Sequence, residues 1–81
     1  MNDSRKSTKK DERALLKIFG RNLNDQRLKK GLTQEQLGEL ANVNYKYIGE
    51  IERGEKNPTA IILYKLSQAL GISVSEIIAE F

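Results

Sequence analysis

The sequence predicts an all-α domain of five helices. Apolar residues recur at spacings of three and four residues in successive segments, which is the period of a helix with one buried face. Three of these segments stop at Gly31, Gly54 and Gly71, and glycine is common just beyond a helix end. No segment alternates apolar and polar residues as a half-buried strand does. A chain of 81 residues allows one small domain.

The composition removes several classes of function. The chain has neither cysteine nor histidine, so it offers no disulfide framework, no thiolate metal site and no histidine general base. It also shows no phosphate-binding loop. We therefore expect no catalytic residues, no metal, no cofactor and no enzymatic activity. No apolar run approaches the roughly 18 residues of a membrane helix, and no signal peptide opens the chain, so a soluble, cytoplasmic protein without membrane contact is expected.

Net charge is weak evidence for a nucleic-acid partner. The formal net charge is +3, and residues 1–13 hold five basic and three acidic side chains, so most of the excess lies near the N-terminus. Residues 1–10 lack apolar periodicity and predict a disordered charged arm. A solvated tail and a phosphate-binding arm both remain open. The folded domain is expected to cover residues 11–81.

Residues 11–30 are expected to form the first helix. Leu16, Phe19 and Leu23 lie on one face of a 3.6-residue period. Arg27 continues this apolar face and is its one charged member.

Residues 33–41 predict a second helix, in which Thr33 and Gln36 form a capping box. Three residues are expected on its inner face: Leu37, Leu40 and Ala41. Residues 42–44, Asn-Val-Asn, then interrupt the pattern. Asparagine tolerates the left-handed conformation of a sharp turn and also caps helices.

The third helix, residues 45–53, is expected to bury Ile48 and Ile51 on one side only. Glycine at position 38 costs about 1 kcal/mol inside a helix, which suggests that the second helix approaches the third closely. Polar groups on the outer side can contact base edges, glutamate by accepting from cytosine N4. A helix in the major groove enters with its N-terminal residues foremost. The outer residues are Tyr45, Lys46 and Glu50.

The fourth helix is expected over residues 60–70, capped by Thr59. A short fifth helix follows, with a capping box formed by Ser73 and Glu76. Four apolar residues exceed the needs of a small core and predict a two-fold dimer interface, although a well-filled core or harmless surface exposure is the alternative. They are Ile61, Tyr64, Ile78 and Phe81.

Residues 15–79 resemble the Cro and phage-repressor (XRE) helix-turn-helix family. The resemblance rests on the GLTQ…LA start, the YI…IE-G third helix, the NP loop and the L…ALGIS…EI ending. It implies a lambda-repressor-like domain of five helices, usually dimeric, that represses or activates transcription. Gly38 stands where the family usually has alanine, and Asn42 where glycine is usual. Both keep the physical requirement, a small residue in one case and a left-handed conformation in the other.

The resemblance also implies roles for single residues. Gln34 is implied to bond a phosphate and to brace the third helix. The implied base contacts are Asn44, Tyr45, Lys46 and Glu50. The implied phosphate contacts are Gln34, Tyr47, Arg53, Lys56 and Asn57. A surface ion pair is the alternative for Lys46 and Glu50, and cover for the edge of the core is the alternative for Tyr45 and Tyr47.

Arg27 and Glu52 are expected to form a partly buried ion pair. Arg27 lies on the apolar face of the first helix, and Glu52 points inward because it follows Ile48 by four residues. The resemblance implies the same pairing. We interpret the pair as structural rather than as a direct contact to DNA.

The predicted function is sequence-specific binding of double-stranded DNA by a homodimeric transcriptional regulator. The operator is expected to be an inverted repeat with half-sites about 34 Å apart, and the protein is expected to associate with the nucleoid. No small-molecule ligand is expected, because no separate ligand-binding domain fits the chain. The alternative is an antitoxin-like interaction module that covers a toxin partner. Phage repressor, antitoxin and restriction-modification controller all remain open as subtypes.

Overall fold

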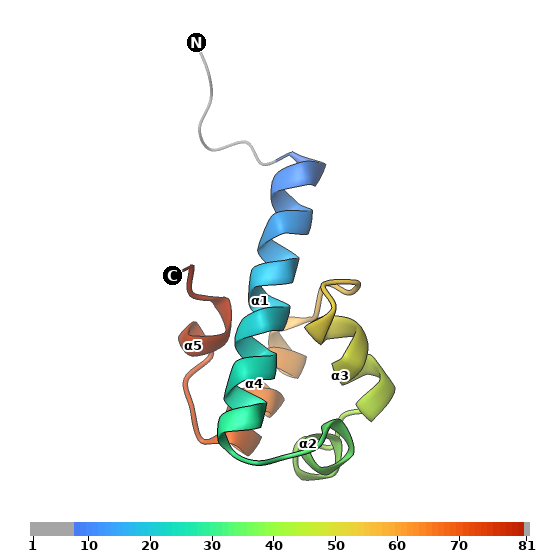
Figure 1. Cartoon of the computed structure of the whole chain (residues 1–81), viewed down its shortest axis with the longest axis vertical. Coiled ribbons are helices and arrows are strands. Elements are labelled where there is room, and N and C mark those ends of the chain that lie inside the picture. Colours follow the sequence, from blue (N-terminus) through green and yellow to red (C-terminus); the bar gives the residue numbers. More distant parts are fainter. Residues whose placement is uncertain (1–7, 81) are drawn as a thin grey trace.

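The structure is a computed structural model that describes residues 8–80, and all regular elements in this range are helices. α1 runs through the centre, with α5 on one side and α2 and α3 on the other (Figure 1). The predicted all-α fold is confirmed. The five helices are α1 (Lys9–Lys29), α2 (Gln34–Ala41), α3 (Tyr45–Glu52), α4 (Ala60–Leu70) and α5 (Ser75–Ile78).

α1 begins earlier than its apolar pattern indicates. The hydroxyl of Thr8 accepts from the Asp11 backbone N–H at 3.1 Å, and the Asp11 carboxylate accepts from the Thr8 N–H at 3.2 Å. This capping box starts the helix at Lys9, because it satisfies backbone donors that would otherwise lack partners. The prediction of a disordered arm over residues 1–10 is therefore wrong for residues 8–10. Residues 1–7 lie outside the described range.

The predicted starts of α2 and α4 are confirmed. The side chain of Thr33 accepts from the Gln36 N–H, and the Gln36 side chain accepts from the Thr33 N–H. Thr59 caps α4 by accepting from Ile62. Caps of this kind are local in sequence, so they fix helix starts without reference to the rest of the fold.

The predicted capping box of α5 is only half formed. The Glu76 carboxylate accepts from the Ser73 N–H at 3.0 Å. The Ser73 hydroxyl instead lies 2.7 Å from the Ser75 hydroxyl, and no side chain caps the N-terminus of α5. The helix starts at Ser75, one residue later than a cap at Ser73 would place it, and has four residues.

The hydrophobic core joins α1 to all four other helices. Its buried apolar residues are Leu23, Leu37, Ala41, Val43, Ile48, Ile51, Leu66, Leu70 and Ile77. The prediction that Leu40 lies on the inner face of α2 is wrong, because its side chain is 62% exposed. The buried arc of α2 is formed by Leu37, Gly38 and Ala41, and position 40 falls just outside it at 100° per residue. No helix among residues 8–80 has the length and apolar character to span a membrane.

Candidate nucleic-acid interface

Two close backbone approaches hold α3 against the body of the domain. A Cβ atom on Gly20 of α1 would lie 2.5 Å from the Glu52 carbonyl oxygen, so α1 and α3 pack at a distance that only glycine permits. A Cβ atom on Gly38 would lie 2.6 Å from the Val43 carbonyl oxygen and 3.3 Å from the Tyr45 Cβ. The predicted close approach at Gly38 is confirmed. The role of Gly20 was missed, although glycine inside a helix signals such contacts.

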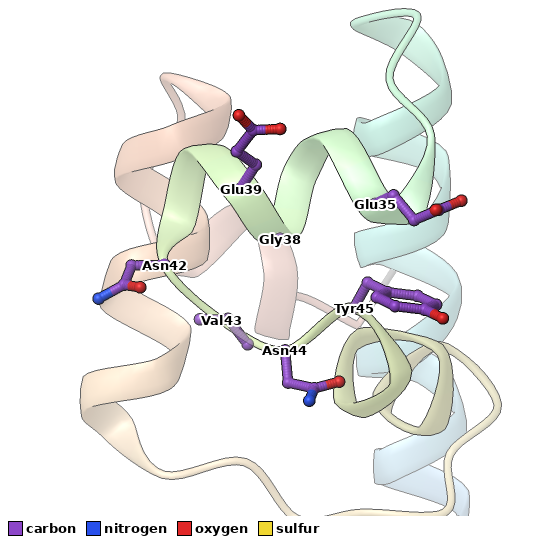
Figure 2. A pocket seen from close by; sticks show the side chains of 7 residues that line it. All are labelled: Glu35, Gly38, Glu39, Asn42, Val43, Asn44 and Tyr45. Atoms are coloured by element: carbon purple, nitrogen blue, oxygen red, sulfur yellow. The ribbon is translucent and has the colours of Figure 1, made fainter.

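The turn between α2 and α3 has the predicted conformation. Asn42 adopts the left-handed conformation, with φ of 56°. Val43 is buried in the turn, and the side chains of Asn42 and Asn44 project outward from it (Figure 2). The Asn44 side chain accepts from the Lys46 N–H at 2.8 Å. The turn therefore fixes the direction of α3, and Asn44 satisfies a donor at its N-terminus.

Arg27 and Glu52 form the predicted ion pair. Arg27 Nε donates to Glu52 Oε2 at 2.7 Å, and Nη2 donates to Oε1 at 3.0 Å. Their side chains are only 10% and 5% exposed. Asn24 and Gln34 also donate to Glu52 Oε1, at 2.9 and 3.1 Å, and Arg27 Nη1 donates to the Leu32 carbonyl. This network joins α1, the start of α2 and the end of α3 around one carboxylate.

The network keeps Glu52 ionised. Burial by itself raises the pKa of the Glu52 carboxyl, but hydrogen bonds from Arg27, Asn24 and Gln34, together with the Arg27 charge, hold that pKa below its ordinary value. At Arg27, burial alone would lower the pKa of the guanidinium. The hydrogen bond to Glu52 outweighs this effect and raises that pKa. Both partners are therefore charged at neutral pH, as a buried pair requires.

Stability should fall in acid because of Glu52. Its pKa is lower in the folded state, so its contribution is full above the ordinary carboxyl pKa of about 4.3 and is lost as the pH falls through the folded-state value. We expect the free energy of urea unfolding to fall from about pH 5 to about pH 3, and Glu52→Gln to flatten this fall. The comparison uses a Glu55→Gln background, because Arg53 also lowers the pKa of the exposed Glu55 carboxyl. Equal slopes with and without Glu52→Gln would contradict this assignment.

The outer side of α3 carries the predicted base-reading residues. Tyr45 is 42% exposed, Lys46 is exposed and Glu50 is half-buried. No ion pair joins Lys46 to Glu50 in the described part of the chain. These side chains border a groove between α3 and the start of α2, whose lining residues are Gln34, Tyr45, Lys46, Gly49, Glu50 and Arg53.

Gly49 forms part of this groove and was missed by the sequence analysis. It is the buried member of the lining. A Cβ atom on it would lie 3.2 Å from Arg53 Nη1 and 3.3 Å from Gln34 Oε1. The bare backbone at this position lets Gln34 reach across α3 to Glu52. The sequence alone does not indicate that another side chain passes over this glycine to reach Glu52, three residues later.

The residues predicted to contact phosphates are in different situations. Gln34 braces α3 through Glu52, and Arg53 is paired with Glu55 at 2.8 Å on the surface. Tyr47 is half-buried and packs against the core, as the alternative interpretation required. Lys56 and Asn57 are exposed in the loop that follows α3. Contact with phosphate stays a prediction for all five.

Three of the predicted dimer residues are exposed on α4 and α5. Ile61 is 66% exposed, Tyr64 57% and Ile78 40%. Phe81 lies outside the described residues. Leu28, at the end of α1, is also 59% exposed and was not predicted to be.

Comparison with known proteins identifies the family. The profile of the helix-turn-helix family matches residues 23–77, from the middle of α1 to α5. The chain belongs to the helix-turn-helix family. Members of this family are DNA-binding transcriptional regulators, and the relatives of this helix-turn-helix protein are regulators rather than enzymes.

Individual relatives agree with this assignment. The helix-turn-helix protein is 44% identical over 62 residues to the HTH-type transcriptional regulator y4dJ of Sinorhizobium fredii, covering 76% of this chain and 80% of the relative. It is 38% identical over 61 residues to the control protein C.SmaI of Serratia marcescens, covering 75% and 73%. The crystal structure of the restriction-modification controller C.AhdI from Aeromonas hydrophila superposes with a TM-score of 0.77 at 39% identity, covering 79% of this chain and 97% of that chain.

Proposed function

We propose that this helix-turn-helix protein is a dimeric, sequence-specific regulator that places α3 in the major groove of an operator. The observation that carries this proposal is the asymmetry of α3. One side is fixed by buried Ile48 and Ile51 and by the inward Glu52. The other side presents Tyr45, Lys46 and Glu50 without partners among the described side chains. A helix held this way can present hydrogen-bonding groups in a fixed register.

The chemistry of these groups suits base edges. Lys46 can donate to guanine O6 and N7, and the Glu50 carboxylate can accept from cytosine N4. Tyr45 and Asn44 lie at the N-terminal end of α3, which enters the groove first. Arg53 is exposed, so it can exchange Glu55 for a phosphate at little desolvation cost. The Gln34 side chain also borders the groove and can support a phosphate contact beside it.

A two-fold dimer fits the exposed apolar residues of α4 and α5. Ile61, Tyr64 and Ile78 would be covered by the same residues of a second copy, as in an isologous interface. Two copies would present their α3 helices about one turn of DNA apart, about 34 Å, which selects an inverted repeat. Regulation would follow from occupancy, by blocking or recruiting polymerase. The likeness to controller proteins supports a small regulator of this kind.

Selection of bound duplexes from a random pool tests this function. We expect the recovered sequences to be inverted repeats, and the affinity for them to fall steeply with salt as phosphate-bound counterions are released. Sedimentation of the chain without DNA should give the mass of two chains at micromolar concentration. Recovery of unrelated sequences would refute sequence-specific reading. A monomer both free and on the duplex would refute the dimer.

A further inference from the structure

The N-terminal part of α1 lies outside the segment that the family profile matches. The match starts at residue 23, whereas α1 starts at Lys9. The first turns of this part, blue in Figure 1, project beyond the other helices. Core packing therefore does not account for its full length, and its surface needs a separate explanation.

Four basic residues of this segment share one face. They lie at i, i+3, i+7 and i+11, which spans about 80° of the helix at 100° per residue. All four are exposed, and no carboxylate within residues 8–80 is ion-paired with any of them. The nearby Asp11 and Glu12 point about 100° and 200° away from the first of the four. We call these residues the basic stripe: Lys10, Arg13, Lys17 and Arg21.

The basic stripe adjoins the proposed DNA-binding surface. A Cβ atom on Gly54, directly after α3, would lie 2.7 Å from Lys17 Cγ and 3.1 Å from Lys17 Cα. Gly54 follows Arg53 and begins the loop that carries Lys56. The backbone directly after α3 therefore contacts the stripe at Lys17, and the basic residues of α1 lie next to those around Gly54.

We propose that the basic stripe binds phosphates of the DNA backbone and extends the contact beyond α2 and α3. The proposal rests on the function proposed above. The stripe covers about 17 Å along the axis of α1, and each DNA strand carries one charge per about 3.4 Å of axis, so several phosphates lie within such a length. Cations on phosphates read no bases. The stripe therefore adds affinity and salt dependence without changing base preference.

The opposite side of this segment favours DNA over a membrane as the partner. Leu15, Leu16 and Phe19 are half-buried and line a groove with Glu12 and with Asn57 of the loop after α3. An interfacial membrane helix needs a free apolar face to insert. Here the apolar face is half-buried beside the loop after α3, and the fully exposed side is cationic.

The test compares Lys10→Gln/Arg13→Gln with the charge-conserving control Lys10→Arg/Arg13→Lys. Both pairs lie on exposed helix surface, and all the residues introduced are good helix formers. The duplex is one selected by the unaltered chain. We expect the slope of log affinity against log salt to flatten by about 0.9 for each phosphate that is no longer neutralised, up to about 1.8 for the glutamine pair, with an unchanged base preference. The control pair should keep the original slope.

Hydroxyl-radical footprinting of the same complexes locates the bound phosphates. The glutamine pair should lose backbone protection at positions that the control still protects. An unchanged slope and footprint would overturn the proposal while leaving the proposed function intact. If only binding to acidic lipid vesicles changed, the stripe would serve a membrane and the proposal would also fall. Failure to select any duplex would count against the proposed function itself.

Discussion

Replacing Glu52 with alanine is expected to lower the free energy of unfolding by about 3–5 kcal/mol, the usual cost of breaking a buried ion pair. The substitution leaves the Arg27 guanidinium almost fully buried, with the Leu32 carbonyl as its remaining partner. It also removes the acceptor of Asn24 and Gln34. Unpaired buried donors and a buried charge both carry a desolvation cost.

Urea unfolding followed by circular dichroism measures this effect. Glu55→Ala is the matched control, because it removes the same side chain from an exposed pair with Arg53 and should change stability little. A decrease for Glu52→Ala no larger than that of the control would mean that the buried network does not hold α3.

Gly20→Ala is expected to destabilise the domain by about 1–2 kcal/mol. The new Cβ would lie 2.5 Å from the Glu52 carbonyl oxygen and 2.8 Å from its carbon, so α3 must move away from α1. Such overpacking costs about 1–3 kcal/mol or more, and the better helix propensity of alanine returns only about 1 kcal/mol. The clash involves backbone atoms, which cannot rotate aside.

Gly49→Ala is the control for this prediction. Its Cβ would meet only the ends of the Arg53 and Gln34 side chains, at 3.2 Å and 3.3 Å. These ends can shift by a few tenths of an ångström and alanine has the better helix propensity, so the midpoint should change much less than for Gly20→Ala even if the Gln34 hydrogen bond to Glu52 weakens. The Gly20→Ala midpoint should fall by about 10 °C, given about 4–8 °C per kcal/mol for a domain of this size. Equal midpoints for the two variants would show that α1 and α3 are not in close backbone contact.

Features encoded locally in the sequence were predicted well. The starts of α2 and α4 follow from Thr33 and Thr59, whose caps involve residues three positions away. The turn followed from Asn42, which tolerates the left-handed conformation. The start of α1 was missed because its Thr8–Asp11 box lies in a polar segment where no apolar period indicates a helix.

Features that depend on the packing of distant segments were only partly predictable. The Arg27–Glu52 pair followed from two charges on inner faces. The convergence of Asn24 and Gln34 on the same carboxylate depends on how α1 and α2 meet α3, which periodicity does not specify. The error at Leu40 has the same origin, since an eight-residue helix leaves the edge of its buried arc undefined. The basic stripe was not identified from the sequence, because Lys10 was assigned to the charged arm and only the fold places Lys17 beside Gly54.

Duplex selection with Glu50→Ala beside the unaltered chain tests most directly whether α3 reads the operator. Glu50 lies on the outer side of α3 and is not part of the Arg27–Glu52 network, so the variant should fold normally. The account predicts inverted repeats from both proteins, with the base preference at one position relaxed symmetrically in both half-sites of the variant. Unchanged preferences at every position, or a uniform loss of affinity on all sequences, would contradict base reading by α3.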